Sequence, residues 1–144
     1  MISIGKLVEV DRTGWQDLFR GYNGFYERAL PPESYDHAWT AFQEDERIHA
    51  LAARLDGHLV GIAHFLVHAS TTASDVCYLQ DLFTAPEVRG QGVATALIEG
   101  VTEWARLRGC SRVYWSTHET NATARRLYDR LADYRGFIRY EINL

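Results

Sequence analysis

The spacing of apolar residues along the chain predicts six strands and four helices. Segments in which apolar and β-branched residues alternate or cluster are typical of strands; they are residues 2–10, 48–55, 59–69, 76–84, 111–116 and 137–142. Segments in which apolar residues recur every three or four positions are typical of helices; they are residues 11–29, 33–45, 91–108 and 121–133. In this order, antiparallel hairpins are combined with one βαβ crossover. The pattern therefore predicts an α/β fold with a mixed, mostly antiparallel twisted sheet flanked by about four helices.

Breaks in the pattern fall at residues that make tight turns or end helices. The pair Asp56-Gly57 separates two apolar runs and favours a two-residue hairpin, because both turn positions need a positive φ. Pro31-Pro32 separates the first two helices, and Gly109 follows the third. No internal repeat, low-complexity tract or linker interrupts the chain, so residues 1–144 are predicted to form one domain.

The composition is that of an ordinary globular domain and excludes several classes of protein. With 144 residues, of which 47% are hydrophobic, the chain can bury a core without a disulfide or a metal. Its two cysteines, Cys77 and Cys110, have no Cys-x-x-Cys spacing, which indicates a reducing, cytoplasmic compartment. No apolar run approaches the length of a membrane span, and the N-terminus lacks the pattern of a signal peptide. The net charge of −4 argues against nucleic acid as a partner.

The negative charge is concentrated in one part of the sequence. Residues 1–60 carry ten acidic and six basic side chains, whereas residues 61–144 carry nine of each. Five of the acids lie within residues 33–46, where there is no Lys or Arg. One interpretation is a solvated helix face. The other is a field that attracts a cationic substrate to this part of the molecule.

The most informative chemical signal is a glycine-rich turn between the fourth strand and the third helix. Gly90 and Gly92 allow the backbone to approach an anion closely, because neither carries a Cβ. Unpaired N–H groups at the start of the helix and the Arg89 guanidinium can both bind phosphate oxygens. Two other phosphate motifs are excluded. A P-loop needs a lysine, and the only one is Lys6; the dinucleotide fingerprint needs a third glycine where Thr95 stands.

Two motifs at a fixed separation are more specific than the turn alone. The loop Arg89-Gly-Gln-Gly92-Val-Ala94 has the form R/Q-x-x-G-x-G/A, and the helix Asn121-Ala-Thr-Ala124-Arg-Arg-Leu-Tyr128 has the form Asn-x-x-Ala-x-x-Leu-Tyr. Together with the strand before the loop, they resemble the GNAT superfamily of acyl-CoA-dependent N-acetyltransferases. The residues of these motifs are most similar to the branch that contains diamine, polyamine and amino-acid acetyltransferases. The matches cover about residues 79–140.

The resemblance implies acetyl-CoA as co-substrate, no metal, and a homodimer. Backbone groups of Leu82, Phe83 and Thr84 are expected to pair with the pantetheine arm like an added strand. The residues expected to hold the pyrophosphate are Arg89, Gly90, Gln91, Gly92, Val93, Ala94 and Thr95. Asn121 is expected to hydrogen-bond the pantetheine arm, and the small Ala124 to leave room for it.

The resemblance also places Tyr128 beside the sulfur of the co-substrate. At 100° per residue, Asn121 and Tyr128 lie roughly 20° apart on one helix face, which is consistent with both facing the same ligand. A departing thiolate needs a proton, and a tyrosine with a reference pKa of about 10 can supply it. Tyr128 is therefore the predicted general acid. The alternative is a core aromatic at Tyr128 with Asn121 as a helix cap.

Several groups are candidates for the base that takes a proton from the attacking amine. Asp81, on the cofactor-binding strand, is the best carboxylate, and its alternative role is a hydrogen-bonding anchor. Diamine-type relatives often have a glutamate at the position of Gln80, so its absence argues against a base there and against polyamine specificity. Strand alternation places Gln80 and Asp81 on opposite faces, so only one can reach the substrate. His118, Glu119 and a chain of waters are the other candidates. An N–H near Leu82 or Phe83, exposed by a bulge, is expected to stabilise developing negative charge.

The acceptor site is expected between the first two helices and the facing ends of the strands. Aromatic and acidic side chains there would bind a small cationic amine through cation–π and ionic contacts. The predicted substrate-binding residues are Tyr26, Glu27, Trp39 and Gln80, and further candidates to line the site are Tyr22, Phe25 and Tyr35. His64 and His68 share a strand face but lie about 13 Å apart, too far for one metal ion.

The sequence therefore predicts an acetyl-CoA-dependent N-acetyltransferase that acts on a primary amine of a small molecule: an amino acid, a diamine or a polyamine. One alternative is a protein or peptide N-acetyltransferase. The other is a non-catalytic acyl-CoA-binding module.

Overall fold

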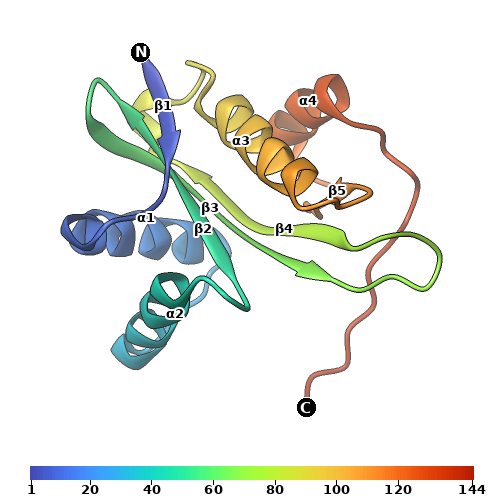
Figure 1. Cartoon of the computed structure of the whole chain (residues 1–144). Coiled ribbons are helices and arrows are strands. Elements are labelled where there is room, and N and C mark those ends of the chain that lie inside the picture. The colour runs from blue at the N-terminus through green and yellow to red at the C-terminus, as the bar shows by residue number, and fades with distance from the viewer.

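The five strands of the sheet lie side by side in the order in which they occur in the chain (Figure 1). The computed structural model describes residues 1–144, and its strands are β1 (Ile2–Gly5), β2 (His49–Leu55), β3 (His58–His68), β4 (Val76–Thr84) and β5 (Val113–Tyr114). Strands β1 to β4 are antiparallel to their neighbours, and β5 pairs in parallel with β4. The prediction of a mixed, mostly antiparallel sheet is confirmed.

Four helices cover the two faces of this sheet (Figure 1). They are α1 (Arg12–Phe25), α2 (Pro32–Glu44), α3 (Val93–Leu107) and α4 (Ala122–Leu131). Helices α1 and α2 pack on one face, α3 packs on the other, and Tyr128 of α4 packs against the apolar cluster beneath α3. None of the four has the length and apolar character that crossing a bilayer requires.

The hairpin between β2 and β3 has the turn that its sequence predicts. Asp56 has a φ of 50° and Gly57 a φ of 86°, the left-handed pair that a two-residue hairpin of this kind needs. The short turn fixes the register of β2 and β3 from their first pair, Leu55 with His58.

Each face of the sheet carries its own apolar cluster. Beneath α3, the fully buried Leu97 and Val101 pack with Phe65 of β3. On the other face, Trp15 of α1 lies 5.3 Å, ring centroid to ring centroid, from Trp39 of α2. The sheet is therefore buried on both sides, and its central strands carry few polar residues.

Strand β4 contains one more residue than the segment of β3 that it pairs with. Phe65 pairs with Leu79 and His64 pairs with Asp81, so the intervening Gln80 has no partner in this ladder. Because of this bulge, Leu79 joins the cluster beneath α3, while Asp81 bonds to His64 on the α1 face. Unbroken alternation would place both side chains on the same face.

Several predicted elements are shorter in the structure. The strand predicted at 2–10 is only β1, followed by a 3₁₀ turn at Glu9–Asp11, and the first helix ends at Phe25 rather than at residue 29. The strand predicted at 111–116 is reduced to two residues, because it pairs only with Cys77 and Tyr78 near the start of β4.

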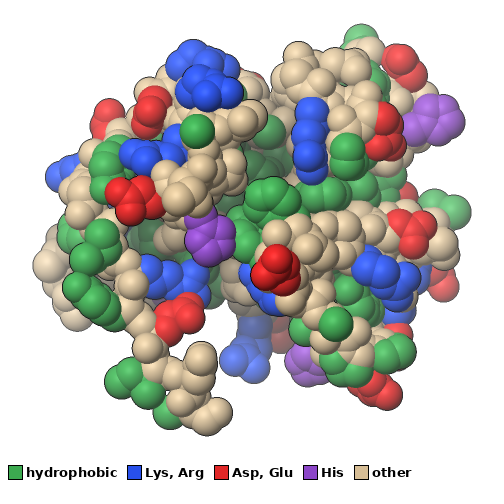
Figure 2. Space-filling model, turned by 180° about the vertical axis from the view of Figure 1, so that it is seen from behind, with side chains coloured by type: hydrophobic (Ala, Val, Ile, Leu, Met, Phe, Trp, Pro, Cys, Tyr) green, Lys and Arg blue, Asp and Glu red, His purple; other side chains and the backbone are tan.

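The strand predicted at residues 137–142 does not form. The chain from residue 133 onwards belongs to no helix or strand, and Phe137 and Ile142 are 87% and 89% exposed. Figures 1 and 2 show this segment projecting from the body of the molecule. An alternating pattern forms a strand only where a neighbour accepts its hydrogen bonds, and nothing within this chain lies beside it to do so.

Gly61 of β3 allows α3 to lie directly on the sheet, which yields a prediction. A Cβ at this position would be 2.8 Å from Val93 Cγ1 and 3.0 Å from Leu97 Cδ1, two side chains that are buried and have no room to move. We expect Gly61→Ala to lower the free energy of unfolding, measured in urea, by about 1–3 kcal/mol. The matched control is Gly5→Ala in β1, where a Cβ meets nothing within 4 Å, with an expected change below about 0.5 kcal/mol. Equal losses in both variants would contradict the close packing of α3 on β3.

Candidate active site

Strand β4 pairs with β5 only near the beginning of β4, and the two chain segments then separate. The last pair joins Tyr78 and Tyr114, so β4 has no partner on this side over residues 79–84. A narrow hollow, here named the notch, opens where the strands separate. It is lined by residues of α1, β4, α4 and the segment after β5: Tyr22, Tyr26, Leu79, Gln80, Leu82, Trp115, Ser116, Thr117 and Tyr128.

The start of α3 presents a group of unpaired backbone donors. Gly92 is the N-cap of the helix, and no side chain caps it. No N–H of residues 90–95 donates to another group of the protein. Gly90 and Gly92 have φ values of 83° and 87°, a conformation that other residues rarely adopt. The loop thus has the free N–H groups and the positive end of a helix dipole that an anion requires.

Asn121 caps α4 and also makes a hydrogen bond to a residue of the notch. As the N-cap of α4, it accepts a hydrogen bond through Oδ1 from the Ala124 N–H at 3.4 Å. Its Nδ2 donates to the Thr117 hydroxyl, also at 3.4 Å, and Thr117 lines the notch. The cap therefore also holds an amide at the edge of the notch.

Tyr128 forms the wall of the notch on the α4 side. Its ring stands edge-on to Trp115, with the ring centroids 5.4 Å apart. Burial raises the pKa of Tyr128 above its ordinary value, and the neighbouring Tyr26 adds to this effect. The phenol therefore keeps its proton throughout the neutral range, as a general acid must.

Aromatic rings at the end of α1 form the opposite wall. Tyr22 and Tyr26 meet edge to face with their centroids 5.0 Å apart, and Tyr26 lies 5.3 Å from the ring of His118. The Tyr22 hydroxyl donates to the Gln80 carbonyl at 3.5 Å. None of the side chains that line the notch carries a carboxylate or a permanent positive charge.

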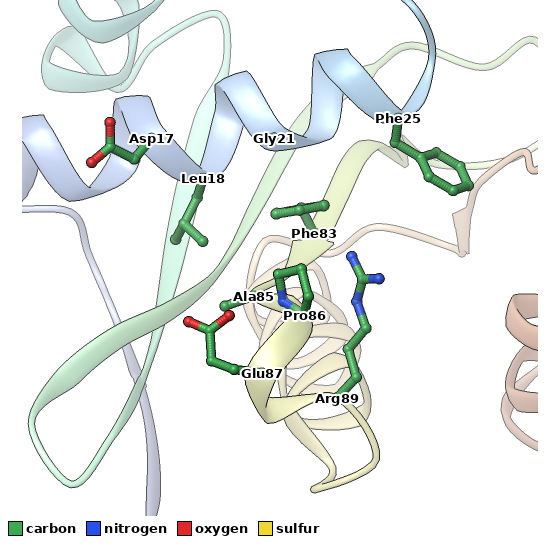
Figure 3. A pocket seen from close by; sticks show the side chains of 9 residues that line it. All are labelled: Asp17, Leu18, Gly21, Phe25, Phe83, Ala85, Pro86, Glu87 and Arg89. Atoms are coloured by element: carbon green, nitrogen blue, oxygen red, sulfur yellow. The ribbon is translucent and has the colours of Figure 1, made fainter.

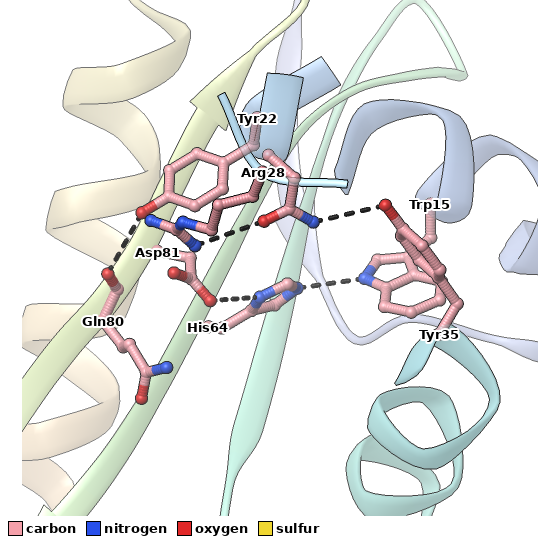
Figure 4. Close-up of polar contacts among 8 residues, drawn as sticks. Trp15, Tyr22, Arg28, Tyr35, His64, Gln80 and Asp81 are labelled. Atoms are coloured by element: carbon pink, nitrogen blue, oxygen red, sulfur yellow. Dashed lines mark hydrogen bonds and ion pairs between the residues drawn. The ribbon is translucent and has the colours of Figure 1, made fainter. Parts of the chain in front are cut away.

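Asp81 lies behind this aromatic wall, at the end of a buried row of hydrogen bonds (Figure 4). Its Oδ2 is 3.0 Å from His64 Nδ1, and His64 Nε2 is 3.0 Å from Trp15 Nε1. An indole N–H can only donate, so Nε2 of His64 accepts and the ring proton is on Nδ1, where it is donated to Asp81. Burial and then the charge of Asp81 raise the pKa of Tyr22. Asp81 thus reaches the notch through the Tyr22 side chain rather than directly.

Two of the predicted substrate-binding residues are not brought to the notch. Trp39 is buried against Trp15, where the aromatic cluster between α1 and α2 needs it. Glu27 is exposed in the turn after α1, with a φ of 57°. The other two, Tyr26 and Gln80, line the notch.

A second hollow, of about 390 Å³, lies between α1 and the end of β4 (Figure 3). Its lining residues are Asp17, Leu18, Gly21, Phe25, Phe83, Ala85, Pro86, Glu87 and Arg89. Arg89 donates from Nε to the Thr84 carbonyl at 3.1 Å, and its guanidinium lies 5.3 Å from the centre of the Phe83 ring. The guanidinium predicted to contact phosphate is therefore directed toward this hollow, close to the loop at the start of α3.

Sequence reasoning missed Trp115, Ser116 and Thr117, which also line the notch. Their signal is positional: they follow a strand that runs parallel to β4, and the carboxyl ends of neighbouring parallel strands lie together. It also missed His64 as the partner of Asp81, because that pairing depends on the register of β3 against β4.

The residues present fit acetyl-CoA. The free edge of β4 can pair with an extended amide-bearing arm, and the unpaired N–H groups of residues 90–95 can bind a pyrophosphate. Thr84 adds a buried hydroxyl, Oγ1, that has no hydrogen-bond partner in the protein. The structure has no group of three or more His, Cys, Asp or Glu side chains that could hold a metal ion.

Comparison with known proteins agrees with this geometry. Residues 15–134 match the family described as the acetyltransferase (GNAT) family. The chain is 33% identical over 126 residues to the D-amino-acid N-acetyltransferase HPA3 of Saccharomyces cerevisiae, covering 85% of this chain and 78% of that protein. It is 33% identical over 97 residues to the thialysine N-epsilon-acetyltransferase of Mus musculus, covering 60% and 56% of the two chains.

Among solved structures, the chain is similar to AAC(6')-Iy in complex with the bisubstrate analogue CoA-S-monomethyl-acetylneamine. The TM-score is 0.88 at 18% identity, and the alignment covers 100% of this chain and 99% of that one. At this identity the likeness shows a shared fold.

The loop before α3 yields a prediction with a control on the same helix. We expect Gly92→Ala to weaken coenzyme A binding, measured by calorimetry, by about tenfold or more, because the left-handed conformation that exposes the N–H groups becomes strained. Gly109→Ala places the same strain (φ 75°) at the other end of α3. Both variants should unfold more easily by about 1 kcal/mol, but Gly109→Ala should bind coenzyme A as the wild type does. Equal affinities for the two variants would show that this loop does not hold the pyrophosphate.

Proposed function

Because the chain belongs to the GNAT family, acyltransferases that transfer an acetyl group from acetyl-CoA to amines, we propose that it acetylates the primary amine of a small molecule. The acceptors in question are an amino acid, a diamine or a polyamine. The observation that carries this proposal is the notch, where the free edge of β4, the phenol of Tyr128 and the aromatic rings of α1 meet.

The donor side of the proposed site consists of β4, the loop before α3, and α4. Acetyl-CoA supplies a thioester, in which the carbon–sulfur bond breaks as the carbonyl carbon forms a bond to the amine nitrogen. Tyr128 donates its proton to the departing sulfur, and its raised pKa ensures that the proton is present. Asn121 orients the arm of the co-substrate with its amide, and the loop of residues 90–95 holds the pyrophosphate.

The acceptor side must remove a proton, because a free alkyl amine with a pKa of about 10.4 is mostly protonated at neutral pH. We assign this to Asp81, acting through the Tyr22 hydroxyl. For this step the Tyr22 hydroxyl turns from its weak 3.5 Å contact with the Gln80 carbonyl to the Asp81 carboxylate, gives its proton to that carboxylate and takes one from the substrate. His64 donates to Asp81 and holds its carboxylate in place, close enough to Tyr22 for its charge to raise the pKa of that phenol. His118 and Glu119 are exposed on the loop before α4, and a chain of waters remains the other route.

The notch also bears on the two alternative functions. A protein or peptide acceptor needs an open groove for an extended chain, whereas the notch is narrow and walled by Tyr22, Tyr26 and Tyr128. A non-catalytic acyl-CoA-binding module has no need of a half-buried, protonated Tyr128 or of a buried carboxylate behind the acceptor wall. The geometry therefore favours catalysis on a small amine.

Replacing Tyr128 tests the proposed reaction. We predict that Tyr128→Phe lowers kcat by about 10²–10⁴-fold, the usual effect of losing a general acid. Its affinity for coenzyme A should stay within about twofold of the wild type. The assay is thiol release with a panel of primary amines: polyamines, D- and L-amino acids, aminoglycosides and lysine peptides. In the wild type, loss of the Tyr128 proton should not slow the reaction until the pH exceeds the ordinary tyrosine value of 10.0.

The control for this experiment is Tyr114→Phe, which removes a phenol hydroxyl from β5 outside the notch and should leave kcat unchanged. A wild-type rate in Tyr128→Phe would remove Tyr128 from the role of acid. Coenzyme A binding without acetylation of any amine in the panel would favour the binding module, and turnover of peptides alone would favour the peptide acetyltransferase.

We also propose that the protein is a homodimer. The C-terminal segment exposes a series of large hydrophobic side chains: Tyr134, Phe137, Ile138, Tyr140, Ile142 and Leu144. Residues 137–142 have the pattern of a strand, and the edge of the sheet at β5 is short and open. A second copy of the chain supplies both a strand edge and an apolar surface for this segment.

Light scattering during size-exclusion chromatography measures the predicted dimer. We expect a mass near twice the 16.5 kDa of the chain, and a shift toward the monomer when both Ile138 and Ile142 are changed to Asp. Asp133→Asn, at the start of the same segment, serves as the control. A wild-type monomer at concentrations of about 100 μM would contradict the proposal.

We propose a reducing compartment, the cytoplasm, as the place of action. Cys77 and Cys110 are both free thiols. Burial raises the pKa of Cys77 to about 12, so this thiol is unreactive in the folded protein.

A further inference from the structure

We infer that the acceptor is an amino acid and that Arg28 recognises its carboxylate; this inference rests on the proposed acetyltransferase function. It narrows the acceptor from any small primary amine to an amine that carries a negative charge. The observation behind it is a single unpaired guanidinium held against the aromatic wall of the notch.

The end of α1 places Arg28 at this position. The carbonyl of Asn23 accepts hydrogen bonds from the N–H groups of Tyr26 and Arg28, at 3.1 and 2.8 Å. Glu27, with its left-handed φ of 57°, turns the chain back between them. The Arg28 guanidinium then lies 5.6 Å from the centre of the Tyr22 ring and 4.9 Å from that of Tyr26. These are two of the rings that line the notch on its acceptor side.

The guanidinium is anchored but not neutralised. Its Nη1 donates to Asn23 Oδ1 at 3.2 Å, and Asn23, fully buried, is itself held by a hydrogen bond from Nδ2 to the Tyr35 hydroxyl at 3.3 Å (Figure 4). Arg28 forms no ion pair with any carboxylate of the protein, its neighbour Glu27 included. Since a guanidinium has five N–H donors, most of its hydrogen-bonding capacity is free for a ligand.

The charges near the acceptor wall match an amino acid better than a diamine. The Arg28 guanidinium lies over the rings of Tyr22 and Tyr26, and the carboxylate of Asp81 also lies near Tyr22, although the two groups form no ion pair. An amino acid carries one charge of each sign close together, so its ammonium can face Tyr22 while its carboxylate faces Arg28. A diamine or polyamine offers Arg28 only further positive charge. The forked geometry of a guanidinium suits a carboxylate, which it can bind through two parallel hydrogen bonds.

The names of two relatives are consistent with this class of acceptor. The yeast protein is a D-amino-acid N-acetyltransferase and the mouse protein a thialysine N-epsilon-acetyltransferase. The inference itself depends on Arg28 and on the neutral lining of the notch.

The test compares amino acids with the amines that lack only their carboxylate. The matched pairs are D- and L-phenylalanine with 2-phenylethylamine, and D- and L-lysine with cadaverine. The wild type should have the higher kcat/KM for at least one amino acid of each pair. Arg28→Gln should lower that kcat/KM by about 10- to 100-fold, mostly through KM, because a charge-assisted contact to the substrate is lost. Its kcat/KM for the two amines should stay within about twofold. Arg28→Lys should fall between the wild type and Arg28→Gln, since it keeps the charge but not the fork.

Arg20→Gln is the matched control. Arg20 also lies on α1 over a tyrosine ring, that of Tyr35 at 5.3 Å, but Tyr35 does not line the notch. This variant should act on both members of each pair as the wild type does. A wild type that prefers the amines, or an Arg28→Gln variant that loses activity equally on both members, overturns the inference while the acetyltransferase function stands. Failure of the wild type to acetylate either class would overturn the proposed function, and the inference with it.

Discussion

The inserted residue in β4 is the constraint on which the rest of the site depends. Gln80 has no partner in the ladder with β3, so the residues on either side of it face opposite sides of the sheet. Asp81 consequently meets His64 on the α1 face instead of entering the apolar cluster beneath α3. A bulge also bends and twists its strand, and here β4 leaves β5 immediately after Tyr78. The bulge at Gln80 thus accounts both for the free edge of β4 proposed to bind acetyl-CoA and for the position of Asp81, the carboxylate proposed to act on the amine.

The structure shows which of the acidic residues in the first part of the sequence are paired with basic groups. Within the acidic segment 33–46, Asp36 is paired with Arg12, and Asp45 with Lys6 and His49. Two of the five acids are therefore matched by basic groups of the protein, and none of the five lines the notch. The groups that lie close to the acceptor side are one guanidinium and one buried carboxylate, so the recognition of a substrate depends on their placement rather than on the net charge of −4.

Features that depend on neighbouring residues could be predicted from the sequence, and those that depend on long-range pairing could not. The hairpin at residues 56–57 and the cap at Asn121 follow from the backbone preferences of the residues themselves. The bulge at Gln80 depends on a strand that pairs with it from earlier in the chain, so simple alternation failed there. Trp39 was misplaced because an aromatic residue on a helix has the same pattern in a core as in a binding site. Residues 137–142 have a strand pattern but lack a partner within one copy of the chain.

We propose that the free edge of β4 binds acetyl-CoA. The most direct test of this proposal measures the hydrogen exchange of individual backbone amides by NMR, with and without coenzyme A. The amides of residues 79–84 that make no bond to β3, together with those of residues 90–95, should exchange more slowly when coenzyme A is bound. Slower exchange confined to other parts of the molecule, with both of these segments unchanged, would contradict a donor site between β4, β5 and the start of α3.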